Sequence, residues 1–295
     1  MRGYCGRFAP TPSGALHFGS LVTALGSFLR ARSQDGRWIV RIDDLDSPRA
    51  VAGASAEILH TLDAYCLHWD DTVQYQSSQV EAYRAALHTL QERDLIYGCA
   101  CSRRELGSAG QRRYPGTCRN ALPAGRTARA LRLRCEGTAG FLDGLQGVHR
   151  QDLSRDVGDF VVRRADGQFA YHLAVVVDDA QSGITEVVRG SDLLACTPRQ
   201  VYLHGLLGLP TPRYLHLPVA VNEARQKLSK QTRAHPLDRG RPGPSLVAAL
   251  SFLRQDPPAY LSRETPGDIL GWAIRHWHPE RIGPARALPA PPGFC

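Results

Sequence analysis

Two lysines are the side chains best suited to chemistry on a phosphate group. The chain has 36 lysines and arginines, and all of them are arginines except Lys227 and Lys230 in the segment 226–231. Lysine carries a compact ammonium on a flexible stem, which the planar guanidinium of arginine does not reproduce. Because lysines are usually scattered over a protein surface, their concentration here predicts a loop in which ammonium groups stabilise developing phosphate charge.

A histidine near the N-terminus is a second candidate for phosphate contact. His17 follows a turn with Gly14 and precedes Gly19, between an apolar run and a pattern of apolar residues at helical spacing. A strand, a turn and a helix in this order are typical of a nucleotide-binding unit, in which the helix N-terminus faces a phosphate. On these residues alone, an ordinary strand–helix turn is at least as good an interpretation.

Carboxylates follow the next predicted strand, which covers residues 38–42. Asp43, Asp44 and Asp46 lie where open α/β sheets bind ligands, at the end of a strand. A turn whose aspartate caps the next helix explains the same residues equally well.

Three of the eight cysteines are close together in sequence, at Cys99, Cys101 and Cys118. This spacing predicts a structural Zn²⁺ site, although free thiols in a small subdomain remain an alternative. By residue type the fourth ligand is open among three candidates, Tyr114, Cys135 and His149. The other cysteines are scattered, which argues against a disulfide framework.

Basic residues are dense between positions 103 and 134. The net charge of +8 and the pI near 9.3 favour a polyanionic partner such as RNA, although a solvated basic surface would have the same composition. The arginines concerned are Arg103, Arg104, Arg112, Arg113, Arg119, Arg126 and Arg129.

The elements that must position these residues alternate between strands and helices, which predicts an α/β core. Helices are expected over 52–65, 80–93, 197–207, 245–254 and 266–277, and strands over 185–188 and 215–221. A β-hairpin with an Asp-Gly turn is expected over 160–171, followed by an apolar segment that is buried until its acidic end at Asp178 and Asp179. The tail from Gly283 is expected to be irregular. No apolar run is long enough to span a bilayer and no apolar signal core is present, so we expect a cytoplasmic protein without a membrane partner.

Together these motifs resemble the class I aminoacyl-tRNA synthetases. His17-Phe18-Gly19-Ser20 and Lys227-Leu228-Ser229-Lys230-Gln231 stand where that class has its two signatures. Segments 6–14, 41–46 and 188–193 resemble the glutamyl branch, and the resemblance extends from about residue 5 to residue 232. Little more than 60 residues follow the lysine loop, which leaves no room for a large anticodon-binding region. This shortness and the cysteine-containing insert resemble the glutamyl-Q subfamily, which modifies queuosine in tRNA(Asp).

The resemblance implies a fold and a division of the chain. The fold is α/β, with a Rossmann-like nucleotide-binding core, an inserted zinc-containing α+β subdomain and a short C-terminal helical region. The core halves would cover 1–98 and 189–232, the insert 99–188 and the helical region 233–295.

The resemblance also implies an activity. ATP and L-glutamate, with Mg²⁺, would form glutamyl-adenylate, and glutamate would pass to queuosine at the wobble position of tRNA(Asp). His17, Lys227 and Lys230 would be catalytic, and His17, Gly19 and Lys230 would bind ATP. Glutamate would be bound by Arg7, Phe8, Ala9, Pro10, Thr11, Asp43, Tyr171 and Arg189. One structural zinc would be held by Cys99, Cys101, Cys118 and, as the unusual fourth ligand, Tyr114.

The sequence departs from the family pattern at two positions. The family usually has Glu where this chain has Asp43, which is one methylene shorter, and more often Asn where it has His172. The alternatives are a compact enzyme that charges the tRNA 3′ end, a related nucleotidyltransferase with a small acceptor, and a non-catalytic zinc-dependent RNA-binding module. Retention of both signatures argues against the last of these.

Overall fold

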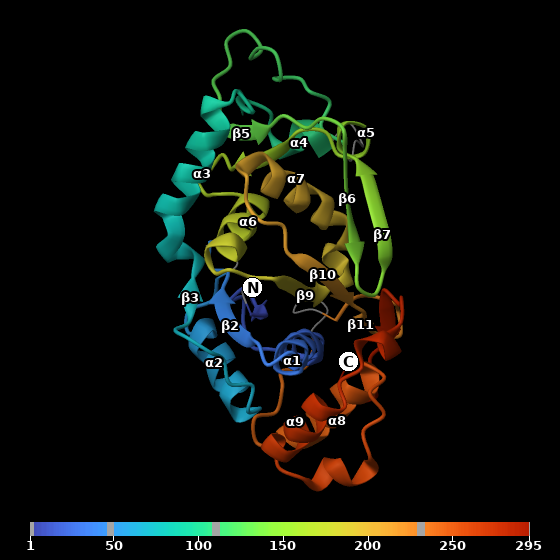
Figure 1. The fold of residues 1–295 in the computed structure, drawn as a ribbon. Coiled ribbons are helices and arrows are strands. Elements are labelled where there is room, and N and C mark those ends of the chain that lie inside the picture. Colours follow the sequence, from blue (N-terminus) through green and yellow to red (C-terminus); the bar gives the residue numbers. More distant parts are fainter. Residues whose placement is uncertain (1–2, 46–49, 108–112, 229–233, 295) are drawn as a thin grey trace.

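A computed structural model describes residues 3–45, 50–107, 113–228 and 234–294 of the chain (Figure 1). The strands are β1 Cys5–Phe8, β2 Arg37–Ile42, β3 Gln74–Tyr75, β4 Ile96–Cys99, β5 Ala130–Leu133, β6 Thr138–Asp143, β7 Gly147–Asp152, β8 Phe160–Arg163, β9 Glu186–Gly190, β10 Arg213–Leu217, β11 Val219–Val221 and β12 Ala287–Pro289. The α-helices are α1 Phe18–Arg32, α2 Ala54–Ala64, α3 Val80–Glu92, α4 Arg103–Gly107, α5 Leu153–Asp156, α6 Tyr171–Gln181, α7 Thr197–Leu207, α8 Pro242–Phe252 and α9 Pro266–Arg275. Short 3₁₀ helices are η2 Gln76–Gln79, η3 Ser191–Cys196, η5 Ala259–Arg263 and η6 Pro279–Ile282.

The centre of the molecule is a parallel sheet. β1 pairs with β2 and β2 with β3, while β10 pairs in parallel with both β9 and β6. Thr185, just before β9, joins the two groups because its N–H donates to the carbonyl of Cys5 at 2.9 Å. The strands therefore follow each other in the order β3, β2, β1, β9, β10, and the predicted α/β class is confirmed.

Helix α1 packs one apolar face onto this sheet. Leu21, Val22, Leu25 and Leu29 are each at most 1% exposed, at the helical spacing seen in the sequence. Burial of each such side chain stabilises the fold by about 1.5–3 kcal/mol. At Gly26 an added Cβ would lie 2.5 Å from Leu217 of β10, so helix and sheet approach closely only because this residue lacks a side chain. This packing fixes the N-terminus of α1 relative to the strand ends.

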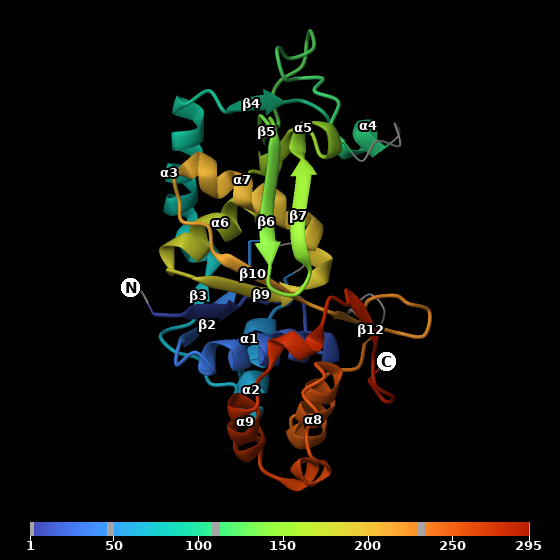
Figure 2. The same cartoon turned by 45° about the vertical axis from the view of Figure 1, so that its right-hand side comes forward.

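A second part of the chain is inserted between β3 and β9. β4, β5 and β8 form an antiparallel sheet beside α3, and the β6–β7 hairpin runs from there back to the core, where β6 pairs with β10 (Figure 2). Its apolar core, which includes Tyr83, Leu133 and Phe160 and also takes in Leu203 of α7, is separate from the core around α1.

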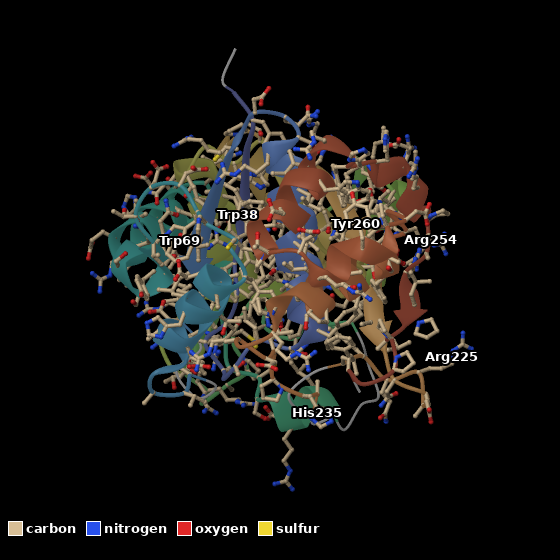
Figure 3. All side chains as sticks on the ribbon, turned by 90° about the horizontal axis from the view of Figure 1, so that it is seen from below. Trp38, Trp69, Arg225, His235, Arg254 and Tyr260 are labelled. Carbon is tan, nitrogen blue, oxygen red and sulfur yellow. The ribbon has the colours of Figure 1, made fainter. Side chains whose placement is uncertain are left out.

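Helices α8 and α9 form one end of the molecule, the lower end in Figure 1. Seen from this end, Figure 3 shows Tyr260 and Arg254 over the orange and red helices, with Trp38 of β2 nearer the middle. Both helices begin with a proline in their first turn and bury Leu246, Leu250, Ile269 and Leu270 against α1. The predicted helices 245–254 and 266–277 are thus confirmed within a few residues. Among the described residues, none of the helices combines the length and the apolar character that crossing a membrane requires.

Three predictions of local structure were wrong. The second arm of the hairpin expected over 160–171 does not continue, because one bridge joins Arg163 to Phe169 and α6 begins at Tyr171. Asp178 and Asp179 are as buried as the apolar residues before them, since both bind partners inside the protein. The tail from Gly283 is not irregular throughout, because β12 pairs in parallel with β11. A run of apolar residues does not by itself distinguish a buried strand from a buried helix.

Candidate functional site

His17 caps the N-terminus of α1. Its Nδ1 accepts a hydrogen bond from the Ser20 N–H at 3.3 Å, and the Ser20 hydroxyl accepts from the His17 N–H at 3.4 Å. This reciprocal capping box satisfies two backbone donors of the first turn. Because Nδ1 is the acceptor, a neutral His17 carries its proton on Nε2. The ring therefore presents a donor together with the positive end of the helix dipole, as an anion would require.

The lysine loop approaches the same helix end. A Cβ at Gly19 would lie 3.2 Å from the His17 ring and 3.7 Å from the carbonyl of Leu228, so this glycine leaves room for both. Leu228 donates to Ala220 of β11, and Leu237 on the far side donates to Leu16. The Nζ of Lys227 donates to Asp192 at 2.6 Å. Lys230 and Asp46 lie outside the described residues.

Five ionisable side chains form a buried cluster at the ends of β1 and β2, which we call the ion cluster: Arg7, Arg41, Asp43, Asp178 and Asp179. Arg7 donates to Asp179 from Nε at 3.3 Å and Nη2 at 3.4 Å. Arg41 donates to Asp43 at 2.7 Å and to Asp179 at 2.6 Å. Each of the five side chains is less than one tenth exposed. Two guanidinium groups face three carboxyl groups, so the fully ionised cluster carries one excess negative charge, which suits a ligand ammonium.

The ion cluster separates the pKa values of its carboxyl groups. Burial alone would raise the pKa of Asp179, but Arg7 and Arg41 outweigh burial and lower that pKa to about 2. Burial raises the pKa of Asp178 to about 6, although Arg41 and hydrogen bonds from Tyr83 and Gln76 oppose it. Burial also raises the pKa of Asp43, against the influence of Arg41. Asp179 is therefore the permanent counter-ion of the cluster.

The neighbouring predicted residues have different environments. The Phe8 side chain is 5% exposed and stacks on Trp38, so it belongs to the core. Ala9, Pro10 and Thr11 form the turn after β1, where the Pro10 carbonyl accepts from the Asp43 N–H at 3.0 Å. Asp44 accepts from the N–H and the hydroxyl of Ser77 at the start of η2. Asp44 therefore does not cap the next helix as the alternative required, because α2 begins after Gly53 without a side-chain cap and Asp44 binds Ser77 instead.

Arg189 lies near the C-terminal end of β9, and Tyr171 is the first residue of α6. The Nη1 of Arg189 is 3.5 Å from the Tyr171 hydroxyl. Its Nη2 donates to Thr197 at 2.8 Å and to Gln200 at 2.7 Å, and its Nε donates to His216 at 3.1 Å. The protein therefore holds the Nε and Nη2 side of this guanidinium, and Nη1 has the longest of the described contacts.

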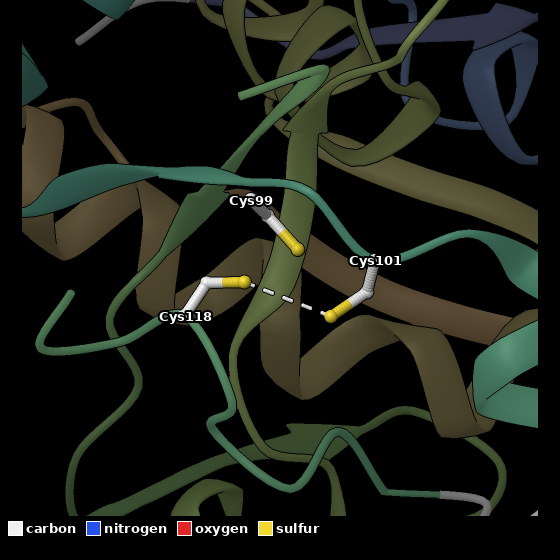
Figure 4. Close-up of side chains that lie close together, drawn as sticks. All are labelled: Cys99, Cys101 and Cys118. Atoms are coloured by element: carbon white, nitrogen blue, oxygen red, sulfur yellow. Dashed lines mark hydrogen bonds between the residues drawn. The ribbon is translucent and has the colours of Figure 1, made fainter. Parts of the chain in front are cut away.

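The three cysteines meet at the end of β4 (Figure 4). The Sγ atoms of Cys101 and Cys118 are 3.7 Å apart, and the Tyr114 hydroxyl is 3.5 Å from Cys99 Sγ and 3.7 Å from Cys101 Sγ. In a regular tetrahedron around zinc, sulfurs would be about 3.8 Å apart and a ligand oxygen about 3.5 Å from each sulfur. The three distances given are close to these values, and the three cysteines form a group that could hold a metal ion.

Arg132 compensates the charge that thiolate ligands would bring to this site. It donates to Cys99 Sγ at 3.2 Å, and its guanidinium lies 3.7 Å above the centre of the Tyr114 ring. Burial raises the pKa of Cys99, but hydrogen bonds from Tyr114 and Arg132 outweigh it and the pKa is lowered. Of the other ligand candidates, Cys135 Sγ contacts the Leu133 carbonyl and His149 contacts the Gln146 carbonyl, and neither belongs to the cysteine group.

Comparison with known proteins gives the family. The family described as tRNA synthetases class I (E and Q), catalytic domain, matches residues 5–239. A protein of Dechloromonas aromatica named glutamyl-Q tRNA(Asp) synthetase is 56% identical over 282 residues, which cover 93% of this chain and 94% of the relative. This chain belongs to the glutamyl-Q tRNA(Asp) synthetases. A relative of the same name from Thiobacillus denitrificans is 53% identical over 295 residues, which cover 97% of this chain and 98% of the relative.

Solved structures agree with the synthetase fold. A glutamate tRNA ligase of Elizabethkingia meningosepticum in complex with its amino acid has a TM-score of 0.80 and 21% identity, and the match covers 98% of this chain and 67% of that chain. The resemblance to class I synthetases that the sequence motifs suggested is therefore confirmed.

The structure also brings to this region residues that the sequence motifs did not assign to the site. Asp178, Asp179 and Arg41 complete the ion cluster, and Arg132 borders the cysteines. His216 and Asp143 stand behind Arg189. The sequence did contain one signal for this pair, a histidine inside the apolar strand 215–221. A buried polar side chain needs a hydrogen-bond partner, so this histidine implied a polar contact in the core.

Proposed function

We propose that this protein activates L-glutamate with ATP and transfers the glutamyl group to queuosine at the wobble position of tRNA(Asp). The observation that carries this proposal is the match of nearly the whole chain to relatives of that name at more than half identity. Two features support it: a helix end whose capping histidine presents a ring donor, and a cluster of buried guanidinium and carboxyl groups.

In the first step, a carboxylate oxygen of glutamate bonds to the α-phosphorus of ATP, and the bond to the pyrophosphate oxygen breaks. The protein mainly positions the reactants and stabilises phosphate charge in such a transfer. The N–H groups at the start of α1 and the Nε2 proton of His17 would face the phosphate oxygens. Lys230 and Lys227 would add positive charge from the loop, and Gly19 would leave the nucleotide room. Mg²⁺ bound with ATP offsets further phosphate charge.

In the second step, a hydroxyl of the queuosine cyclopentenediol attacks the glutamyl carbonyl. An ester bond forms, the bond to AMP breaks, and the hydroxyl proton is released. The wobble base belongs to a polyanion, and the net charge of +8 suits such a partner. Arg104 and Arg113 are exposed, as an RNA-facing surface of the insert requires.

We assign glutamate to the space between the ion cluster and Arg189. The excess negative charge near Asp43 would hold the α-ammonium, and Arg189 would hold a carboxylate through Nη1, with Tyr171 beside it. Arg7 would contribute positive potential while bound to Asp179, because both of its described hydrogen bonds go to that residue. Phe8, Ala9, Pro10 and Thr11 would contribute backbone groups and shape.

We also propose one structural Zn²⁺ held by Cys99, Cys101, Cys118 and Tyr114. The distances among the four donors support this set. The ion would fix the end of β4 against the loop before Cys118, and it takes no part in the transfer.

We also propose the division of the chain that the family resemblance implies. Core halves 1–98 and 189–232 would enclose a zinc-containing insert at 99–188, with the helical region 233–295 at the end. β4 ends at Cys99 and β9 begins at Glu186, close to both limits of the insert.

The test is the destination of labelled glutamate. The full chain receives ATP, labelled glutamate and tRNA(Asp) with or without queuosine, and the anticodon fragment is then separated from the 3′ fragment. We expect label in the anticodon fragment only when queuosine is present. Label at the 3′ end would instead indicate a compact charging enzyme, and no glutamate-dependent pyrophosphate exchange would favour a non-catalytic RNA-binding module.

A further inference from the structure

Arg189 is held from behind by a buried pair of side chains. His216 lies on β10, next to Arg189 on the paired strand β9, and its side chain is fully buried. Its Nδ1 is 2.6 Å from Asp143 Oδ2, and its Nε2 is 3.1 Å from both Arg189 Nε and the Thr197 hydroxyl. Asp143, His216 and Arg189 therefore form a continuous chain of hydrogen bonds that ends at the glutamate side of the site.

The partners fix the proton on His216. A guanidinium has only donors, so the ring nitrogen that faces Arg189 must offer a lone pair. A carboxylate has only acceptors, so the nitrogen that faces Asp143 must carry the hydrogen. His216 is consequently neutral with its proton on Nδ1. Protonation of Nε2 would bring two buried cations within 3.1 Å of each other, and burial together with Arg189 lowers the pKa of His216 despite Asp143.

Asp143 is itself held rigidly. Its Oδ1 accepts from the N–H groups of Leu145, Gln146 and His216 at 3.0, 2.9 and 3.2 Å, at the turn of the β6–β7 hairpin. These bonds leave Oδ2 for His216. Burial would raise the pKa of Asp143, but the hydrogen bond from His216 outweighs burial and that pKa is lowered. The carboxylate stays ionised and keeps the imidazole in one orientation.

We propose that His216, oriented by Asp143, is a positioning residue for glutamate: its Nε2 lone pair holds Arg189 Nε so that Nη1 faces the substrate carboxylate. This inference rests on the proposed binding of glutamate by Arg189. Thr197 and Gln200 accept hydrogen bonds only from Nη2 of Arg189. With these bonds alone the guanidinium could still rotate about Nη2, so a bond to Nε is needed to fix the direction of Nη1. Loss of the acceptor would therefore weaken glutamate binding more than it slows the chemical step.

Two substitutions of His216 distinguish the role of the Nε2 acceptor from that of the Nδ1 donor. His216→Asn keeps a donor near the position of Nδ1 and removes the acceptor at Nε2. His216→Gln places an amide oxygen near the position of Nε2 and loses the donor toward Asp143. Asp143→Asn keeps the Oδ1 bonds of the turn but replaces Oδ2 with a donor, which forces the His216 proton onto Nε2.

The experiment measures glutamate transfer to queuosine-containing tRNA(Asp) at varied glutamate, and glutamate binding by calorimetry. We expect His216→Asn and Asp143→Asn to raise the KM and Kd for glutamate about tenfold or more, with kcat and the KM for ATP changed less than about threefold. We expect His216→Gln to recover most of the affinity. Thermal unfolding of each variant identifies any that fails to fold, and nitrogen NMR of the wild-type ring reports its Nδ1 proton independently.

Three outcomes would overturn the inference. Equal glutamate Kd values for folded His216→Asn and wild type would refute it while leaving the proposed function intact. A loss of kcat with unchanged KM would assign His216 another role. A wild-type protein that binds no glutamate would overturn both this inference and the proposed function.

Discussion

Asp179→Asn is the most informative perturbation of the ion cluster. The side chain accepts three hydrogen bonds from Arg7 and Arg41, with side-chain exposures of 4%, 2% and 3% for Arg7, Arg41 and Asp179. The amide is almost the same size as the carboxylate, but it removes one charge and turns one acceptor into a donor against a guanidinium. Removal of one partner from a buried ion pair costs about 3–5 kcal/mol, because the other charge stays buried.

The pKa of Asp179 gives a second measure of the same contact. Its lowering from 3.8 to about 2 corresponds to about 2 kcal/mol of stability. Because the folded-state pKa is the lower one, this contribution is present above pH 3.8 and is lost as the pH falls toward 2. We expect the substitution to cost more than this, since it also leaves donors of the two arginines without a proper acceptor.

Asp71→Asn is the matched control. Arg37 and Asp71 also form an ion pair at 2.6 Å, but their side chains are 58% and 53% exposed. An exposed pair contributes about 0–1 kcal/mol. We expect urea unfolding, followed by circular dichroism, to give a much larger loss for Asp179→Asn than for Asp71→Asn. Equal losses in the two variants would show that burial does not determine the strength of the cluster, and the reasoning would fail.

The remaining predictions concern the metal, the pH and the loop. Tyr114→Phe should lower zinc retention against a chelator, measured by metal analysis, while Tyr97→Phe, whose hydroxyl donates to Asp159, should leave it unchanged; equal retention would remove Tyr114 as a ligand. Burial lowers the pKa of His204 to about 4 in the folded protein. As the pH falls below 6.5, His204 therefore binds a proton in the unfolded chain before it does so in the folded protein. The free energy of unfolding of the wild type should consequently fall by up to about 3 kcal/mol between pH 6.5 and pH 4. His204→Gln should flatten that dependence, and an unchanged slope would contradict it. Lys230→Ala should nearly abolish pyrophosphate exchange at unchanged thermal stability, and full activity would refute the role of the loop.

The local pattern of the sequence predicted the parts of this fold that depend on short-range rules. The apolar spacing of Leu21, Val22 and Leu25 sufficed for α1, and proline at the start of α9 marked its first turn. The three cysteines were correctly grouped, since residues two apart on an extended segment point to the same side.

Long-range contacts explain what the sequence left out. Asp43 and Asp179 are 136 positions apart, and only the folded sheet brings both to Arg41. α6 resembled no particular element because its middle, residues 173–179, is buried on all sides and has no polar face to reveal its period. The role of His216 also could not be predicted from the sequence, because its partners Asp143 and Arg189 come from other strands.

Because lysine is so scarce in this chain, reagents that act on lysine modify or cleave it in the lysine loop. Lys227 is half-exposed and paired with Asp192, and with Lys230 it supplies all the side-chain amines of the chain. A lysine-specific protease can therefore cleave the unmodified chain only in this loop, and an amine-reactive reagent has only these two side chains and the N-terminus to acylate. Protection of Lys227 and Lys230 by added nucleotide would read out occupancy of the site in the native enzyme, with no label engineered into it.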